Sequence, residues 1–537
     1  MNTKYIFVTG GVVSSLGKGI ISASIGKLLQ ARGYSLTIQK FDPYINIDPG
    51  TLNPYEHGEC YVTYDGMETD LDLGHYERFT GIRTTRDNSV TTGRIYKSVI
   101  DRERHGDYLG KTIQVVPHIT DEIKRRIMRE EDPTHYDFVI TEVGGTIGDI
   151  ESAPFMEAIR QLKWELGKDA VNIHLTYVPY LKAAGELKTK PTQHSVKELQ
   201  SMGIQPDILI LRTEKHLETA IRAKVASFCN VDLDCVVQSE DLPSIYEVPV
   251  NMQKQGLDTA ILRKTGLLTT PTPSLGAWLT FLENLKTATE QVHIGLVGKY
   301  DLQDAYKSIR ECLIQAAVYN HRKADIQFIN SENITAENIA DMLKGLDGII
   351  ICPGFGSRGI EGKIIAAQYT RTHDIPTFGI CLGMQMMVIE FARNVLGYSD
   401  AHSKEIDENT PHNVIDIMED QKNITNMGGT MRLGAYACEL REGSRVRTIY
   451  GQEAIQERHR HRYEFNNDYL TQYEANGMQC TGRNPESNLI EIVEIPDLKW
   501  YIGTQFHPEY SGTLLNPHPL FMDFIKTAIE RGVNSEE

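Results

Sequence analysis

The fold of the second half of the chain is decided by one stretch, Thr377-Phe378-Gly379-Ile380-Cys381-Leu382-Gly383-Met384-Gln385. An apolar run ends at Cys381, and the residues from Met384 to Ala392 have the pattern of a helix. Gly379 and Gly383 let neighbouring backbone approach without a Cβ clash. This arrangement predicts a nucleophile elbow, a tight strand-to-helix turn that exposes the cysteine at the carboxyl edge of a sheet. The helix N-terminus favours the thiolate, and the flanking glycines disfavour the alternative of a buried structural cysteine.

Two further motifs supply the groups that a cysteine nucleophile needs. In Ile502-Gly-Thr-Gln-Phe-His507-Pro-Glu509, His507 follows another apolar run, so we expect it at a strand end, where Glu509 fixes its tautomer. In the run that ends in Cys352-Pro-Gly-Phe-Gly356, a buried strand leads into a glycine-rich turn whose N–H groups can help that of Leu382 form an oxyanion hole. With these motifs in this order, the chain from about His293 onward resembles the class I glutamine amidotransferase family of the Cys-His-Glu type. The resemblance implies glutamine hydrolysis through a thioester, with release of ammonia.

Length and composition limit the other possibilities. A chain of 537 residues is expected to form two or more domains, and 40% hydrophobic with 24% charged residues is typical of soluble globular proteins. No apolar run is long enough for a membrane span and no signal peptide precedes the first predicted strand, so we expect no membrane partner. The eight scattered cysteines favour a reducing cytoplasm over disulfides or a zinc site. The net charge of −17 disfavours nucleic-acid polymers as partners and requires local basic clusters for any anionic ligand.

Near the N-terminus, the sequence has the pattern of a phosphate-binding loop. The apolar strand Tyr5–Thr9 leads into Gly10-Gly-Val-Val-Ser-Ser-Leu-Gly-Lys18-Gly19, and residues 20–32 have helical spacing. The N–H groups and the helix dipole of such a loop hold phosphate oxygens, and Lys18 is placed to reach the terminal ones. The match to the usual pattern is imperfect, because Gly11 lies one residue early and Gly19 replaces the Ser or Thr that usually holds magnesium.

We therefore expect carboxylates to hold the metal in place of the missing hydroxyl. Glu142 ends a predicted strand, which is the position of a Walker B-like acid in a sheet that begins with a phosphate loop. Asp72 lies in a segment, Leu71–Phe79, whose sequence predicts a polar and irregular region. Lys40 ends a second predicted strand and is placed to meet ATP phosphates, although a lysine at a strand end is usually only solvated.

Two polar segments suit a nucleotide. The glycine-rich run Gly144–Glu151 follows Glu142, and its two acids can hold sugar hydroxyls or a base edge. The run Gly185–His194 contains two lysines, two threonines and an amide, and Lys224 follows on a helical stretch. Each lysine alone could be a solvated surface charge. Together, in an acidic protein with a phosphate loop, they favour a triphosphate ligand.

Over nearly its whole length, the chain resembles the CTP synthase family. The resemblance is carried by GGVVSSLGKGI from Gly10, FDPYIN from Phe41, EVGGTIGDIES from Glu142, GELKTKPTQHSVKEL from Gly185 and the amidotransferase half. It implies that the chain aminates UTP to CTP with ATP as co-substrate, Mg²⁺ as cofactor and ammonia from L-glutamine, through a 4-phosphorylated UTP. It also implies GTP as an activator, CTP as a feedback inhibitor, and a homotetramer that can form filaments.

The resemblance also implies the residues of each site. Catalysis of glutamine hydrolysis falls to Cys381, His507 and Glu509. ATP binding falls to Ser15, Leu16, Gly17, Lys18, Gly19, Ile20, Lys40, Asp72, Glu240, Asp241 and Leu242. UTP or CTP binding falls to Ser14, Asp149, Ile150, Glu151, Lys188, Thr189, Lys190, Pro191, Thr192, Gln193 and Lys224. Glutamine binding falls to Gly354, Leu382, Gly383, Met384, Gln385, Glu405 and Arg462. Metal binding falls to Asp72 and Glu142, and the GTP candidates are Arg104–Gly110, Lys307 and Thr430–Arg432.

The predicted fold class is α/β, with two doubly wound domains. Residues 1–266 are expected to form an N-terminal P-loop synthetase domain that resembles dethiobiotin synthetase. Residues 267–292 are expected to form a linker with a bridging helix, and residues 293–532 the class I glutamine amidotransferase domain. Residues 533–537 are expected to be a frayed tail.

Two other functions fit parts of this sequence. One is a two-domain amidotransferase whose ATP-dependent half aminates a carboxylate, as in the cobyrinic acid synthetases, or carries out dethiobiotin formation. The segment Lys188–Gln193 favours a triphosphate acceptor over those substrates. The other is a nucleotide-switched scaffold without catalysis, which the intact elements for two reactions disfavour.

Overall fold

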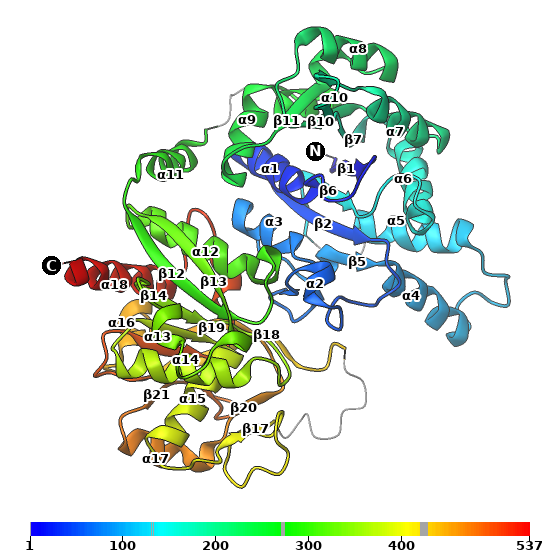
Figure 1. Ribbon diagram of the computed structural model, residues 1–537. Helices are drawn as coiled ribbons and strands as arrows, with labels where there is room; N and C mark the ends of the chain where they lie inside the picture. The colour runs from blue at the N-terminus through cyan, green and yellow to red at the C-terminus, as the bar shows by residue number, and fades with distance from the viewer. Residues whose placement is uncertain (1, 130–131, 133, 270–273, 419–427, 537) are drawn as a thin grey trace. The chain divides into compact units, whose positions relative to one another are not determined.

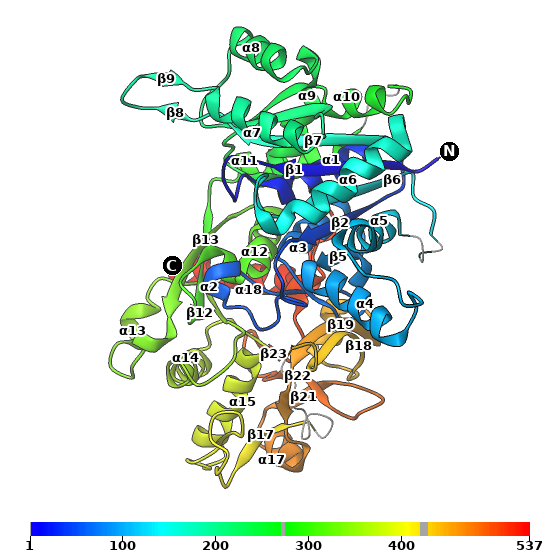
Figure 2. The ribbon, with the colours of Figure 1, turned by 90° about the vertical axis from the view of Figure 1, so that its right-hand side faces the viewer.

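The computed structural model describes residues 2–129, 132, 134–269, 274–418 and 428–536 (Figures 1 and 2). Its contacts divide the chain into two compact units. Unit 1 comprises Met1–Asp48 and Asp72–Gly276, and unit 2 comprises Pro49–Leu71 and Ala277–Glu537. No helix among the described residues has both the length and the apolar character needed to span a bilayer.

Unit 1 is built on a parallel sheet with the strand order β11-β10-β7-β1-β6-β2-β5. The strand bounds are β1 Lys4–Gly10, β2 Leu36–Asp42, β5 Ser89–Thr91, β6 Phe138–Val143, β7 Ala170–Tyr177, β10 Ile208–Thr213 and β11 Val236–Glu240. Strands β1, β2 and β6 are buried at every residue, as expected for parallel strands covered on both faces. The order reverses direction at β1, so the loops after β1, β6 and β2 meet at a topological switch point, where ligands of such sheets bind.

Helices cover both faces of this sheet (Figure 2). The core on one face includes residues of α4, α5 and α6, whereas α1 packs with α3, α9 and α10 on the other. The helix bounds are α1 Lys18–Ala31, α3 Asp72–Thr80, α4 Thr92–His105, α5 Thr120–Met128, α6 Ala153–Leu166, α7 Lys190–Ser201, α8 Thr219–Cys229, α9 Val248–Lys254 and α10 Leu257–Lys264. A two-stranded hairpin, β8 Tyr180–Leu181 with β9 Glu186–Leu187, precedes α7.

The prediction of an irregular region around Asp72 was wrong, because these residues form helix α3. The segment was misread because its charged side chains are buried and paired inside the unit rather than solvated. Glu77, for example, accepts hydrogen bonds from the Thr84 N–H at 2.8 Å and the Thr84 hydroxyl at 2.6 Å. Asp72 is the first residue of the helix, so its position is fixed by regular structure.

Unit 2 contains a nine-stranded sheet among its described residues, in the order β13-β12-β14-β15-β23-β22-β21-β18-β19. The first five strands are parallel, as in a doubly wound sheet, and the last four run antiparallel to their neighbours. The strand bounds are β12 Gln291–Gly298, β13 Lys323–Asn330, β14 Gly348–Ile351, β15 Thr377–Ile380, β18 Arg432–Leu440, β19 Ala454–His461, β21 Gln479–Arg483, β22 Ile490–Glu494 and β23 Tyr501–Thr504. The predicted α/β class is confirmed for both units, but the antiparallel extension was not predicted.

Two hydrophobic clusters cover the faces of this sheet. One contains residues of α14 and α15, and the other contains residues of α12 and α18. The helix bounds are α11 Gly276–Thr287, α12 Lys307–Tyr319, α13 Ile339–Met342, α14 Ile360–Thr372, α15 Leu382–Asn394, α16 Arg445–Tyr450, α17 Leu470–Ala475 and α18 Pro519–Glu536. A small sheet of β16 His402–Ser403, β17 Asn413–Ile417 and β20 Tyr463–Phe465 completes the unit. Of the predicted linker, residues 270–273 lie outside the described residues, and α18 extends through the predicted tail to Glu536.

Residues 49–71, here called the inserted segment, belong to unit 2 although they lie between β2 and α3 in sequence. The segment contains α2 Pro54–His57 and the short strands β3 Tyr61–Val62 and β4 Glu68–Thr69. Glu59 accepts a hydrogen bond from the Ser308 N–H at 2.9 Å, at the start of α12, and Tyr61 donates one to the Tyr510 carbonyl at 3.0 Å. The segment is therefore held by several distant parts of unit 2.

Candidate active site

The elbow at Cys381 connects β15 to α15. Cys381 has φ 52° and ψ −107°, a backbone conformation that costs a non-glycine residue free energy and is found at functional sites. A Cβ added at Gly383 would lie 1.9 Å from the Ile351 carbonyl oxygen, and one at Gly379 would lie 2.2 Å from the Met387 sulfur. Both glycines are thus needed for the close packing of the turn.

His507 lies near Cys381 because their strands are neighbours. β15 pairs in parallel with β23, so the residues that follow both strands reach the same edge of the sheet. His507 Nδ1 and Glu509 Oε1 are 2.7 Å apart, which orients the imidazole, and no hydrogen bond to Nε2 occurs within the described residues. Burial lowers the pKa of His507, but the negative charges of Glu509 and Cys381 outweigh it and raise the pKa to about 10. The protonated imidazolium form of His507 is therefore favoured beside the Cys381 sulfur.

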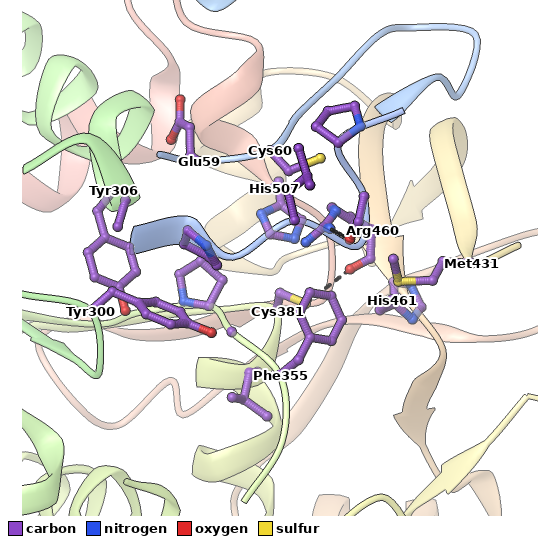
Figure 3. Close-up of a pocket in the computed structure, with 18 of the residues that line it drawn as sticks. Glu59, Cys60, Tyr300, Tyr306, Phe355, Cys381, Met431, Arg460, His461 and His507 are labelled. Carbon is purple, nitrogen blue, oxygen red and sulfur yellow. Dashed lines mark hydrogen bonds between the residues drawn. The ribbon is translucent and has the colours of Figure 1, made fainter. Parts of the chain in front are cut away.

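Cys381, His507 and Glu509 line a cavity of about 590 Å³ (Figure 3). The Cys381 sulfur also lies 3.7 Å from the Arg460 carbonyl oxygen, marked by a dashed line. Most of the residues predicted to bind glutamine line the same cavity, namely Gly354, Leu382, Gln385, Glu405 and Arg462. Gly383 and Met384 do not line it, because Gly383 packs against β14 and Met384 is buried in the core.

The turn Cys352–Gly356 follows β14, the neighbour of β15, and so reaches the same edge. Gly354 has φ 154°, which favours glycine, and the Gly356 N–H donates to Glu405 Oε1 at 2.8 Å. Burial raises the pKa of Glu405. Neither the Gly354 N–H nor the Leu382 N–H donates a hydrogen bond within the described chain, so both donors are open to a ligand oxygen.

Residues of the inserted segment form a further part of the cavity wall. The sequence analysis did not predict this role for the segment. Arg460 donates to Glu68 Oε1 at 2.8 Å and to the Gly50 carbonyl at 3.0 Å, and the Glu68 carboxylate is fully buried. The lining residues from this segment are Pro49, Gly50, Thr51, Leu52, Pro54, His57, Gly58, Glu59, Cys60 and Asp70. No local pattern indicates this packing, since its partners lie far away in sequence.

In unit 1, the loop after β1 has the conformation of an anion-binding loop. Ser15 and Gly17 have φ 60° and 89°, and α1 begins at Lys18. Successive N–H groups of such a loop form a concave site for phosphate oxygens at the helix N-terminus. Lys18 Nζ donates to the Gly145 carbonyl at 2.6 Å, so the loop after β6 lies beside the phosphate loop.

Three carboxylates surround Lys40 at the same edge. Lys40 Nζ is bonded to Asp72, lies 2.9 Å from Glu142 Oε1 and lies 3.9 Å from Asp42 Oδ1. Burial raises the pKa of Asp42 to about 6 and also raises the pKa of Glu142; Lys40 opposes these shifts, and the neighbouring carboxylates add to them. A Cβ at Gly19 would lie 1.9 Å from Asp72 Oδ1, so the Asp72 carboxylate lies against the residue that replaces the usual Ser or Thr. The cluster contains more carboxylates than lysines around one point of the sheet edge.

The other predicted nucleotide residues lie at or after the ends of strands of this sheet, or in helices that follow those strands. Asp149–Glu151 form an exposed turn before α6, Lys190 begins α7, and Lys224 is exposed on α8. Several members of the set have structural partners: the Thr192 hydroxyl donates to the Tyr177 carbonyl at 2.9 Å, the Gln193 amide donates to the Thr189 hydroxyl at 3.1 Å, and Lys188 pairs with Glu186. The remaining members are Ser14, Ile150 and Pro191, and the adenine candidates are Glu240, Asp241 and Leu242 at the end of β11.

One GTP candidate does not face solvent. Arg432 is buried and forms an ion pair of 2.8 Å with Glu491 in the core of unit 2. Lys307 pairs with Glu311 at 3.1 Å on α12, and the side chain of Arg104 is exposed on α4. The core position of Arg432 in β18 could not be told from the sequence, and its role toward GTP stays a prediction.

The fold and the two sites define a glutamine amidotransferase of the Cys-His-Glu type that also carries a phosphate-loop synthetase unit. Residues 4–267 match the family model "CTP synthase N-terminus", and residues 301–527 match the model "Glutamine amidotransferase class-I". The chain belongs to the CTP synthase family and is a ligase.

Relatives match over the full length. A protein of Bacteroides thetaiotaomicron named CTP synthase is 72% identical over 99% of this chain and 99% of its own length. One of Bacteroides fragilis with the same name is 70% identical over 98% of this chain and 99% of its own, and one of Porphyromonas gingivalis is 63% identical over 100% of both. The match extends through both units, which favours this family over the carboxylate-aminating alternatives.

Proposed function

We propose that this chain converts UTP to CTP with ATP and with ammonia that it releases from glutamine. The observation that carries the proposal is the oriented His507–Glu509 pair beside Cys381 in a cavity of about 590 Å³, within a chain that also carries a phosphate loop. Family membership supports the pairing of the two activities in one chain.

In the glutaminase reaction, the Cys381 thiolate attacks the side-chain carbonyl carbon of glutamine. The negative oxygen that forms accepts hydrogen bonds from the N–H groups of Gly354 and Leu382. His507 protonates the leaving nitrogen, the C–N bond breaks, and ammonia departs from a thioester. His507 then takes a proton from water as the water attacks the thioester, which releases glutamate and restores the sulfur. Glu405 and Arg462 are proposed to hold the charged groups of the glutamine backbone.

In the synthetase reaction, the loop from Ser15 to Ile20 holds the ATP phosphates, and Lys18 and Lys40 stabilise the phosphoryl group during transfer to O4 of UTP. Phosphate is a better leaving group than the original oxygen, so ammonia can add at C4 and displace it. Asp72 and Glu142, with Asp42 beside them, are proposed to hold Mg²⁺, which would neutralise charge on the phosphates. The excess of buried carboxylates around one lysine supports that assignment.

The finer predictions rest on the family and not on the geometry. We propose GTP as activator and CTP as feedback inhibitor at the UTP site, with a homotetramer as the working form and a cytoplasmic location. The division into residues 1–266, 267–292, 293–532 and 533–537 also stays a prediction, as do the adenine and UTP contacts.

The proposal is tested by incubating the protein with ATP, Mg²⁺, UTP and either glutamine or ammonium chloride, with CTP measured by chromatography. We expect CTP from both nitrogen sources. In Cys381→Ala, synthesis from glutamine is expected to fall by several orders of magnitude while synthesis from ammonia stays within about twofold, because only one route uses the thiolate. Consumption of another acceptor in place of UTP would contradict the proposed reaction, and glutamine-driven synthesis by Cys381→Ala would contradict the nucleophile.

A further inference from the structure

Two lysines without a role in the proposed mechanism are buried in unit 2. Lys299 directly follows β12 and is 1% exposed, and Lys363 lies in α14 and is 0% exposed. Neither pairs with a carboxylate within the described residues. Burial lowers the pKa of Lys299 to about 8 and that of Lys363 to about 7. A buried amine without a carboxylate partner costs free energy, so each is a candidate for a role in the nearby site.

The two amines hold one turn of the backbone. Lys363 Nζ donates to the Cys352 carbonyl at 2.6 Å and lies 3.5 Å from the Pro353 carbonyl. Lys299 Nζ donates to the Phe355 carbonyl and to the Gly356 carbonyl, the latter at 3.2 Å. Four of the five carbonyl oxygens in Cys352–Gly356 are thus close to one of the two lysine amines.

This arrangement fixes where the N–H groups of the turn point, because C=O and N–H point in opposite directions in a trans peptide. The peptide between Phe355 and Gly356 illustrates the rule. Its carbonyl is held by Lys299, and its N–H donates to Glu405 Oε1 at 2.8 Å, on the side of the cavity. The peptide between Pro353 and Gly354 has its carbonyl oxygen 3.5 Å from Lys363 Nζ, so the Gly354 N–H faces away from that lysine.

The packing around Gly354 strengthens the link between lysine and turn. A Cβ added there would lie 3.0 Å from Lys299 Cε, so the lysine stem lies directly under the turn. Gly354 also has φ 154°, so the surrounding structure must hold this residue in a conformation that favours glycine. Without a cation behind it, a glycine-rich turn can rotate its peptides, since glycine has few steric limits.

We propose that Lys299 and Lys363 are positioning residues of the glutaminase, which hold the carbonyls of Cys352–Gly356 so that its N–H groups serve the cavity. Lys363 aims the Gly354 N–H at the oxyanion of the reacting glutamine. Lys299 aims the Gly356 N–H at Glu405 and so places that carboxylate for the substrate. This inference rests on the proposed hydrolysis of glutamine, and it assigns two further residues to that reaction.

The test compares Lys363→Met and Lys299→Met, in the full chain, for release of glutamate from glutamine and for CTP formation from ammonium chloride. For Lys363→Met we expect kcat for glutamate release to fall about 10- to 100-fold with KM nearly unchanged, since an oxyanion donor acts mainly in the transition state. For Lys299→Met we expect a rise in KM for glutamine, because Glu405 contacts bound substrate. CTP formation from ammonia is expected to stay at the wild-type rate in both.

Matched variants separate positioning from loss of structure. Lys526→Met, at an exposed position of α18, is the control and is expected to match the wild type. Lys363→Gln and Lys299→Gln keep an N–H donor without the charge and are expected to recover most of the lost activity. Unchanged glutaminase in the Met variants, or equal loss of the glutamine and ammonia reactions in the Gln variants, would overturn the inference. Glutamate release is read independently of CTP, so a failure to make CTP would count against the proposed synthesis and not against the lysines.

Discussion

The imidazole of His507 lies beside the sulfur of Cys381, and the charge of this imidazole depends on Glu509. Glu509 contacts Nδ1 at 2.7 Å, and its charge helps to raise the pKa of His507 to about 10, against the effect of burial. A histidine with a raised pKa in the folded state binds its proton more tightly there than in the unfolded chain. Its stabilisation is complete below the ordinary pKa of 6.5 and is lost as pH rises toward 10.

Glu509→Gln should weaken this pH dependence. The amide keeps the shape of the side chain but removes its charge, so the pKa of His507 falls toward its ordinary value. We expect the wild type to lose more stability than Glu509→Gln between pH values near 6.5 and near 10. The measurement is the thermal unfolding midpoint of each protein across this range. An equal fall in both proteins would show that Glu509 does not set the charge of His507.

Gly383 is a second residue whose role is fixed by geometry. In Gly383→Ala the new Cβ would lie 1.9 Å from the Ile351 carbonyl oxygen, and this atom belongs to a strand in the centre of the sheet. We expect a loss of at least about 1–3 kcal/mol in the free energy of unfolding, the usual cost of overpacking, together with loss of glutamine hydrolysis. Gly276→Ala is the control, because its nearest neighbour would be at 3.8 Å. Activity retained in Gly383→Ala would mean that the elbow tolerates a shift of its helix.

At the scale of elements, the inserted segment is the least expected part of unit 2. It follows β2 in sequence, yet its Glu68 pairs with Arg460 of β19, and its residues form one wall of the cavity. A buried ion pair that loses one partner leaves an uncompensated charge, which costs about 3–5 kcal/mol. The segment is thus a structural part of the glutaminase unit.

Glu68→Ala tests this view of the segment. We expect unit 2 to lose about 3–5 kcal/mol of stability and the rate of glutamine hydrolysis to fall, because Arg460 would remain buried without its partner. Glu453→Ala removes an exposed partner of Arg447 and is expected to cost under about 1 kcal/mol. Chemical unfolding followed by fluorescence gives both values. Equal, small losses in the two variants would show that the segment contributes little to the unit.

The elements that could be predicted are those defined by local spacing. The elbow at Cys381 and the loop before Lys18 are specified by glycines within a few residues, and both lie where the sequence placed them. The helix that begins at Asp72 and the core position of Arg432 were not anticipated, because burial of charged side chains such as Glu77 and Arg432 depends on tertiary contacts. The same limit explains why the inserted segment, Lys363 and the antiparallel half of the second sheet escaped prediction, since no local pattern indicates that their contacts form.

The whole molecule is acidic, although several of the ligands proposed for it, such as the triphosphates, are anions. The net charge of −17 repels triphosphates at long range, but this field is screened within about 10 Å at moderate salt, so binding depends on groups at contact. We propose that Lys18, Lys40 and the N–H groups of the phosphate loop provide these groups in unit 1. Ammonia poses the opposite problem, because in water near neutral pH it becomes ammonium, which has no lone pair for attack.

We expect ammonia to pass between the two reactions without entering the solution. Lys18→Ala should lose CTP formation from both nitrogen sources, because phosphoryl transfer precedes amination, whereas Cys381→Ala should keep the ammonia route. We mix the two variants with ATP, Mg²⁺, UTP, GTP and glutamine, and measure glutamate and CTP together. We expect glutamate from Lys18→Ala but CTP at under about a tenth of the wild-type rate, because released ammonia is protonated and diluted before it reaches Cys381→Ala. Added ammonium chloride should restore CTP formation, which controls for the activity of the second variant. CTP formation by the mixture at the wild-type rate would mean that ammonia travels through the solvent, and that the union of both reactions in one chain serves another purpose.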